Sequence, residues 1–121
     1  MGVSALFLPL SRSLQSAATP SEEVMWRKLD LAHDSLDALA LDDFEALAAY
    51  ADDFEALGRA GEWLESESPG YQTESDQFRR AAAALGEAAS NRDSGAAVLA
   101  YVDLTLRCIR CHRALGVRPP R

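Results

Sequence analysis

The stretch that decides the fold runs from Ala97 to Cys111, near the C-terminal end, and reads AVLAYVDLTLRCIRC. Within it, Ala97, Tyr101, Leu104, Cys108 and Cys111 recur at alternating steps of four and three residues. This spacing aligns all five side chains along one face of an α-helix. The stretch therefore predicts a long helix that turns one face, with both cysteines on it, toward a core.

Three further helices are predicted: from 20 to 40, from the Asp42-Asp43 cap to the turn residues 66–70, and from about 73 to 89. Thr19-Pro20-Ser21-Glu22 is typical of a helix start, because the hydroxyl and the carboxylate can accept free N–H groups and proline suits the first position. No stretch of the sequence alternates polar and apolar residues as strands do. Four helices joined by short loops predict an all-α fold, an antiparallel up-down-up-down four-helix bundle.

The periodicity also predicts which side chains face the core. These are Met25, Leu29, Ala32, Leu36 and Leu39 in the first helix, Phe44, Leu47, Ala51, Phe54 and Gly58 in the second, and Phe78, Ala82, Leu85 and Ala89 in the third.

Length and charge narrow the class of protein. The chain has 121 residues, which suits one domain, and we expect residues 19–116 to form it and residues 117–121 to be a non-helical tail. With 19 acidic against 12 basic residues the net charge is -7, which disfavours nucleic acid as a partner. The apolar run at 3–10 is too short for a membrane span. Residues 1–18 are interpreted as a leader or a partial signal peptide that ends in small residues.

The two cysteines, the only ones in the chain, form the sequence Cys108-Ile109-Arg110-Cys111-His112. Cys-x-x-Cys-His is the attachment pattern of c-type haem, in which each thiol adds across one vinyl group and the adjacent imidazole ligates the iron. The spacing of three and four residues places Cys108, Cys111 and His112 on neighbouring parts of one helix face. The pattern predicts one covalently attached haem c at one end of the bundle.

Three other interpretations of this motif remain open. A redox-active dithiol is disfavoured, because the cysteines lie near a helix C-terminus, where the helix dipole raises a thiol pKa. Structural zinc would need Cys108, Cys111, His112 and His33 together, with two sequence neighbours as ligands of one tetrahedral ion. Packing alone would explain the buried cysteines but not the histidine.

The chain resembles the cytochrome c-prime family of bundle haem proteins, and especially a short subgroup of it. Besides the haem motif, the resemblance rests on residues 25–29 (MWRKL), 62–63 (EW), 78–82 (FRRAA) and 100–105 (AYVDLT), and it covers about residues 22–115. It implies one covalent haem, His112 as the proximal ligand, and a periplasmic or otherwise exported location. The sequence departs from the family after the motif, where Arg113-Ala114-Leu115-Gly116 replaces an aromatic residue followed by a basic one.

Bundle topology predicts which residues share the haem end with His112. The start of the first helix lies there, and Met25 stands about as far from that end as His112 does, so Met25 is the candidate sixth iron ligand, with core packing as the alternative. His33 lies about 12 Å beyond Met25 and is assigned to a boundary position. The candidate pocket walls are Leu29, Trp63, Tyr71, Phe78, Tyr101 and Leu104. Arg27, Lys28, Arg79 and Arg80 are at the same end, where one could pair with a haem propionate.

The functional expectation is a monohaem electron carrier that serves a redox partner protein. A haem protein that binds a diatomic gas, NO or CO, on five-coordinate iron is the first alternative, in which an apolar wall around Met25 and Leu29 keeps out strongly polar ligands. A zinc-stabilised or metal-free interaction bundle is the second. No enzymatic activity is expected, since the chain lacks a catalytic triad and a phosphate-binding loop. A homodimer through exposed apolar positions on the first two helices is compatible with the pattern.

Overall fold

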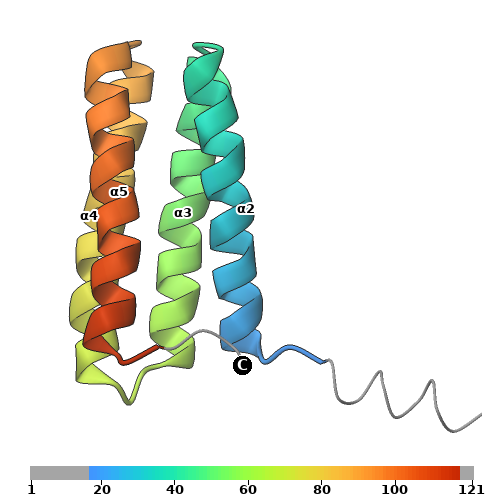
Figure 1. The fold of residues 1–121 in the computed structure, drawn as a ribbon, viewed down its shortest axis with the longest axis vertical. Helices are drawn as coiled ribbons and strands as arrows, with labels where there is room; N and C mark the ends of the chain where they lie inside the picture. The colour runs from blue at the N-terminus through green and yellow to red at the C-terminus, as the bar shows by residue number, and fades with distance from the viewer. Residues whose placement is uncertain (1–16, 118–121) are drawn as a thin grey trace, which may run out of the picture.

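The structure, a computed structural model, describes residues 17–117. It contains four helices in chain order: α2 (Pro20–Ala40), α3 (Phe44–Leu64), α4 (Pro69–Ser90) and α5 (Ser94–Ala114). Consecutive helices run in opposite directions, so the predicted up-down-up-down bundle is confirmed (Figure 1). The described residues contain no strand. Almost all of the predicted leader and tail lies outside the described residues.

Each helix begins at a residue whose side chain accepts a backbone N–H of the first turn. These capping residues are Thr19, Asp43, Ser68 and Asp93. Such caps satisfy N–H groups that have no partner inside the helix. The sequence predicted that this helix begins at about Thr73. It begins at Pro69, because Ser68 caps the helix and proline fits the first position.

Two tight turns close one end of the bundle, between α2 and α3 and between α4 and α5. Asp42 and Arg92, the middle residues of these turns, have φ values of 51° and 53°. The Ser94 hydroxyl donates a hydrogen bond of 3.3 Å to the Asp42 carboxylate, which links the two turns. The other end of the bundle holds the start of α2, the α3–α4 loop and the end of α5 (Figure 1).

Helices α3 and α4 form the core as predicted. Leu47, Ala51, Phe54 and Gly58 of α3 and Phe78, Ala82, Leu85 and Ala89 of α4 are buried, while Phe44 is only half-buried. The rings of Phe54 and Phe78 meet edge to face, with centroids 5.8 Å apart and planes at 80°. This geometry is the favourable one for two aromatic quadrupoles.

The predicted core face of α2 is only partly right. The helix buries Val24, Ser35 and Ala38, and Ala32 and Leu39 are half-buried against the core, whereas Leu29 and Leu36 are 44% and 56% exposed. The apolar surface of α2 is wider than the strip that α3 covers, so Leu29 and Leu36 lie on its uncovered side. That side faces α5, and few residues of the two helices meet.

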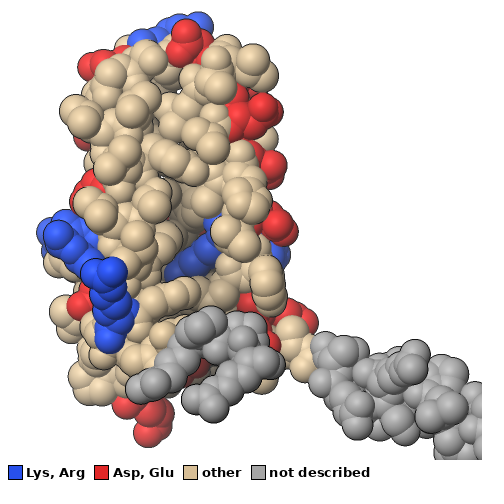
Figure 2. Space-filling model, in the orientation of Figure 1, with Lys and Arg blue, Asp and Glu red and all other residues tan. Residues whose placement is uncertain are grey.

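Helix α5 also leaves part of its predicted core face uncovered. Ala97 and Leu104 are buried, but Tyr101, Cys108 and Cys111 are only half-buried. The Tyr101 hydroxyl crosses to α2 and donates a hydrogen bond of 2.8 Å to the Ala32 carbonyl. Figure 2 shows the consequence: a hollow runs down the face between the two helices, with basic side-chain atoms inside it.

In the described part of the chain, no helix combines the length and the apolar character that crossing a bilayer requires.

Candidate functional site

A cavity of about 520 Å³ lies between α2 and α5, with α4 and α3 behind it. Most of the predicted site residues line it: Met25, Leu29, Tyr71, Phe78, Tyr101, Leu104, Cys108, Cys111 and His112. The volume falls in the range of small-molecule sites, and the lining is largely apolar, as such sites require. Four helices therefore bring the haem motif and its predicted surroundings to one place.

Trp63 is the predicted pocket residue that the structure does not bring to the cavity. It is 79% exposed and is not among the lining residues. It follows the buried Gly61 by two positions, which is roughly 200° around a helix. Its level along the bundle is that of the site, but its side of α3 is the outer one.

The two thiols line the cavity as free cysteines. Burial raises the pKa of both, and the nearby Lys28 ammonium offsets part of this rise. Thiols with raised pKa values stay protonated at neutral pH, whereas a redox-active dithiol needs a thiolate. The arrangement therefore disfavours disulfide exchange.

His112 adjoins these thiols in the last turn of α5, where it lines the cavity yet stays exposed. Its backbone is held by the helix end, since the Val117 N–H donates a hydrogen bond of 2.9 Å to the His112 carbonyl. An imidazole on a fixed backbone next to two thiols is a ligand that can be aimed at a metal inside a porphyrin.

The wall behind the cavity depends on two buried glycines of α3. A Cβ at Gly61 would clash with the Tyr71 hydroxyl, and one at Gly58 would meet the side chains of Arg79 and Phe78. These glycines allow the start of α4 to approach α3 closely. Burial, with smaller contributions from nearby acidic groups, raises the pKa of Tyr71 to about 12. The tyrosine is therefore a neutral wall residue across the physiological range.

Two of the basic residues considered for propionate binding already have partners. Arg79 makes hydrogen bonds of 2.7 and 3.0 Å to Glu62, and Arg80 lies 2.9 Å from the Asp76 carboxylate. Lys28 differs, because it lines the cavity with its Nζ 4.2 Å from the centroid of the Phe78 ring. Of the four candidates, Lys28 is the cation inside the site.

The pocket walls predicted from the sequence left out several lining residues: Trp26, Ala32, His33, Phe54, Ser75, Thr105 and Arg107. The sequence did indicate that Phe54 and Ala32 face inward, since both lie on predicted core faces. Lys28 was predicted at the haem end, as one of four cations that could pair with a propionate. His33 was assigned to a boundary position away from the haem, but the cavity extends along α2 from Met25 to His33 and includes it.

Within residues 17–117, no three His, Cys, Asp or Glu side chains are grouped so that they could hold a metal ion. Tetrahedral zinc needs such a group, so the structure lends no support to the zinc interpretation.

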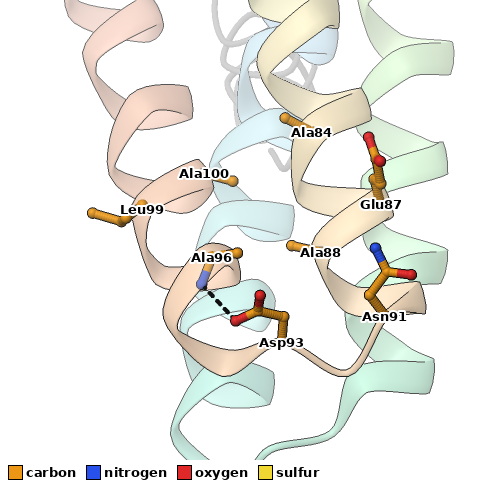
Figure 3. Close-up of a pocket in the computed structure, with 8 residues that line it drawn as sticks. All are labelled: Ala84, Glu87, Ala88, Asn91, Asp93, Ala96, Leu99 and Ala100. Atoms are coloured by element: carbon orange, nitrogen blue, oxygen red, sulfur yellow. Dashed lines mark hydrogen bonds between the residues drawn. The ribbon is translucent and has the colours of Figure 1, made fainter.

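A second hollow, of about 460 Å³, lies between α4 and α5 near the closed end (Figure 3). Half of its lining residues are alanines, and the Asp93 carboxylate accepts a hydrogen bond of 3.0 Å from the Ala96 N–H, the bond drawn in Figure 3. It offers no nucleophile and no histidine, so the cavity between α2 and α5 is the candidate site.

Comparisons of the chain with protein-family models, with curated proteins and with solved structures give no match.

Proposed function

We propose that the protein is a monohaem c-type cytochrome of the four-helix-bundle kind that carries electrons to or from a redox partner protein. The observation that carries the proposal is that Cys108, Cys111 and His112 line one largely apolar cavity of about 520 Å³. A haem plate is a ligand of this size class and needs apolar walls. When bound, haem iron supplies one-electron chemistry by cycling between its ferric and ferrous states.

The chain's own groups would hold the haem at two points. In each attachment a thiol S–H adds across a vinyl C=C bond, so that sulfur bonds to one vinyl carbon and the hydrogen goes to the other, with no oxidant or reductant needed. His112 would ligate the iron, and Phe78, Tyr71 and Leu104 would form apolar walls. Met25, on the opposite helix, is the proposed sixth ligand.

The rim of the cavity suits a transient partner. Trp26 and Leu29 line the cavity and are 61% and 44% exposed. Exposed apolar groups beside a cofactor site favour a brief contact with another protein. Such a contact would place the partner close to the haem edge.

Haem staining of a denaturing gel tests the attachment. Protein from an exporting host that matures c-type cytochromes should stain, because thioether bonds survive denaturation, and the Cys108→Ser, Cys111→Ser double variant should not. An unstained wild-type band would contradict the proposal and favour the metal-free bundle.

An optical spectrum then tests the electron-carrier role. A low-spin spectrum with a methionine-to-iron charge-transfer band, lost in Met25→Leu, is the expected result. A high-spin spectrum that changes on addition of CO and is insensitive to Met25→Leu would instead identify the gas-binding alternative.

A further inference from the structure

Lys28 is the feature of the cavity that the proposed function leaves without a role. Its position on α2 belongs to the half-buried face of the helix, and its side chain lies inside the cavity over Phe78. No hydrogen bond or ion pair within residues 17–117 involves its ammonium. Its ammonium makes a cation–π contact with Phe78, which is of modest strength.

An ammonium in this situation calls for an acceptor. Burial lowers the pKa of Lys28, and the negative forms of Cys108 and Cys111, followed by Glu62, act in the opposite direction. Moving a charge into an apolar site without a paired group costs free energy, and a hydrogen-bonding anion recovers it. The occupant of the cavity, or a molecule that enters with it, can supply that acceptor.

Two acceptors are available in a haem site: a propionate and a small ligand bound at the iron. The two thioether attachments and the two propionates lie on opposite edges of a haem. Lys28 stands on α2, across the cavity from His112 on α5. This position favours the small ligand over the propionate, because such a ligand would bind on the side away from His112.

Resting on the proposed haem function, we propose that Lys28 donates a hydrogen bond to a small anionic ligand that enters the cavity on the α2 side. The site then selects anions such as azide over neutral diatomic molecules. This reverses the expectation from the sequence, in which the wall around Met25 and Leu29 is apolar throughout and keeps strongly polar ligands out. The buried cation makes that wall selective.

The test is titration of the ferric holoprotein with azide, followed by its optical spectrum. Lys28→Leu removes the donor without adding a thioether that could itself ligate the iron, and we expect it to weaken azide binding about tenfold or more. Arg27→Leu is the matched control, since Arg27 is exposed, adjacent and outside the lining, and it should change the affinity less than about twofold. Lys28→Arg should restore part of the affinity. Binding of CO to the ferrous protein, which needs no charge partner, should be the same in all variants.

Each titration is repeated in the Met25→Leu background. Without this change, Met25 could occupy the iron and block azide binding whether or not Lys28 is present. Equal azide affinity in Lys28→Leu and the wild type would overturn the inference, as would absence of azide binding in the Met25→Leu protein. Failure of the inference is distinguishable from failure of the proposed function, because a protein without haem gives no visible spectrum to titrate.

Discussion

The bundle consists of two helix pairs of nearly equal length that are packed very differently. Helices α3 and α4 interlock through Phe54, Phe78 and Leu85, and two glycines of α3 admit α4 side chains. Helices α2 and α5 bury few side chains and leave large apolar ones exposed along a cavity. The difference shows that one pair forms a packed core while the other leaves a cavity between its helices. We propose that an apolar occupant, held by Cys108 and Cys111, completes the second pair.

The largest expected effect comes from removing the attachment. The Cys108→Ser, Cys111→Ser double variant should be less stable than the holoprotein by at least about 4 kcal/mol, the linkage expected when a ligand is present at roughly a thousand times its Kd. Hydrogen exchange should show that protection is lost first in α2 and α5 while α3 and α4 keep theirs. Equal loss along all four helices would contradict the division into two pairs.

Truncations in the two pairs should also differ. Leu85→Ala should cost about 2–5 kcal/mol with or without haem, because it opens a cavity in the packed core. Leu29→Ala should cost less than about 1 kcal/mol in the haem-free double-serine background, since this side chain is already partly in water, and more in the holoprotein. Chemical denaturation of six proteins, the two parents and both variants in each background, measures these differences. If Leu29→Ala costs the same with and without haem, Leu29 does not contact the haem.

The wall behind the cavity makes a pH-dependent contribution. Burial raises the pKa of Tyr71 from 10.0 to about 12, so above pH 10 the unfolded chain loses this proton while the folded chain keeps it. Stability contributed by the neutral phenol is therefore complete below pH 10 and falls between pH 10 and 12, by roughly 2 kcal/mol. Unfolding curves across this window should show the fall in stability in the wild type. The control variant Tyr50→Phe, which changes a tyrosine on α3, should show the same fall. In Tyr71→Phe the fall in stability should be smaller. If this variant loses as much stability between pH 10 and 12 as the wild type does, the Tyr71 phenol is not the cause of the fall.

The smallest effect concerns the bridge between α2 and α5. Tyr101→Phe removes the hydrogen bond to the Ala32 carbonyl and should cost about 1 kcal/mol, with faster hydrogen exchange in α2. Thr105→Val is the control, because the hydrogen bond that it removes, to the Tyr101 carbonyl, lies within α5. Exchange in α2 that responds equally to both substitutions would show that the bridge has no special role.

The same division explains what the sequence could predict. The core faces of α3 and α4 were predicted correctly, apart from the half-buried Phe44, since these helices pack against protein and follow the periods of three and four residues. On α2 the prediction was only partly right, because its apolar surface serves both the core and the cavity, and periodicity does not separate the two. The motif located the cysteines and His112, and topology located Met25, Tyr71 and Phe78.

The positions of Trp63 and Lys28 relative to the cavity could not be predicted from hydrophobic periodicity. Trp63 lies at the right level but on the outer side of α3, because the helix turns Gly58 and Gly61 inward. Lys28 is charged and would be placed in solvent by its type, yet its long side chain enters the cavity and lies over Phe78. Such a placement depends on the gap between α2 and α5, which only the packed structure reveals.

The most direct test of the account is the intact mass of the denatured protein after maturation in a host that attaches c-type haem, together with a count of reactive thiols. The account predicts the mass of the polypeptide plus one haem, and no free thiol. The mass of the polypeptide alone, with two thiols that react, would show that the cavity between α2 and α5 is not completed by haem.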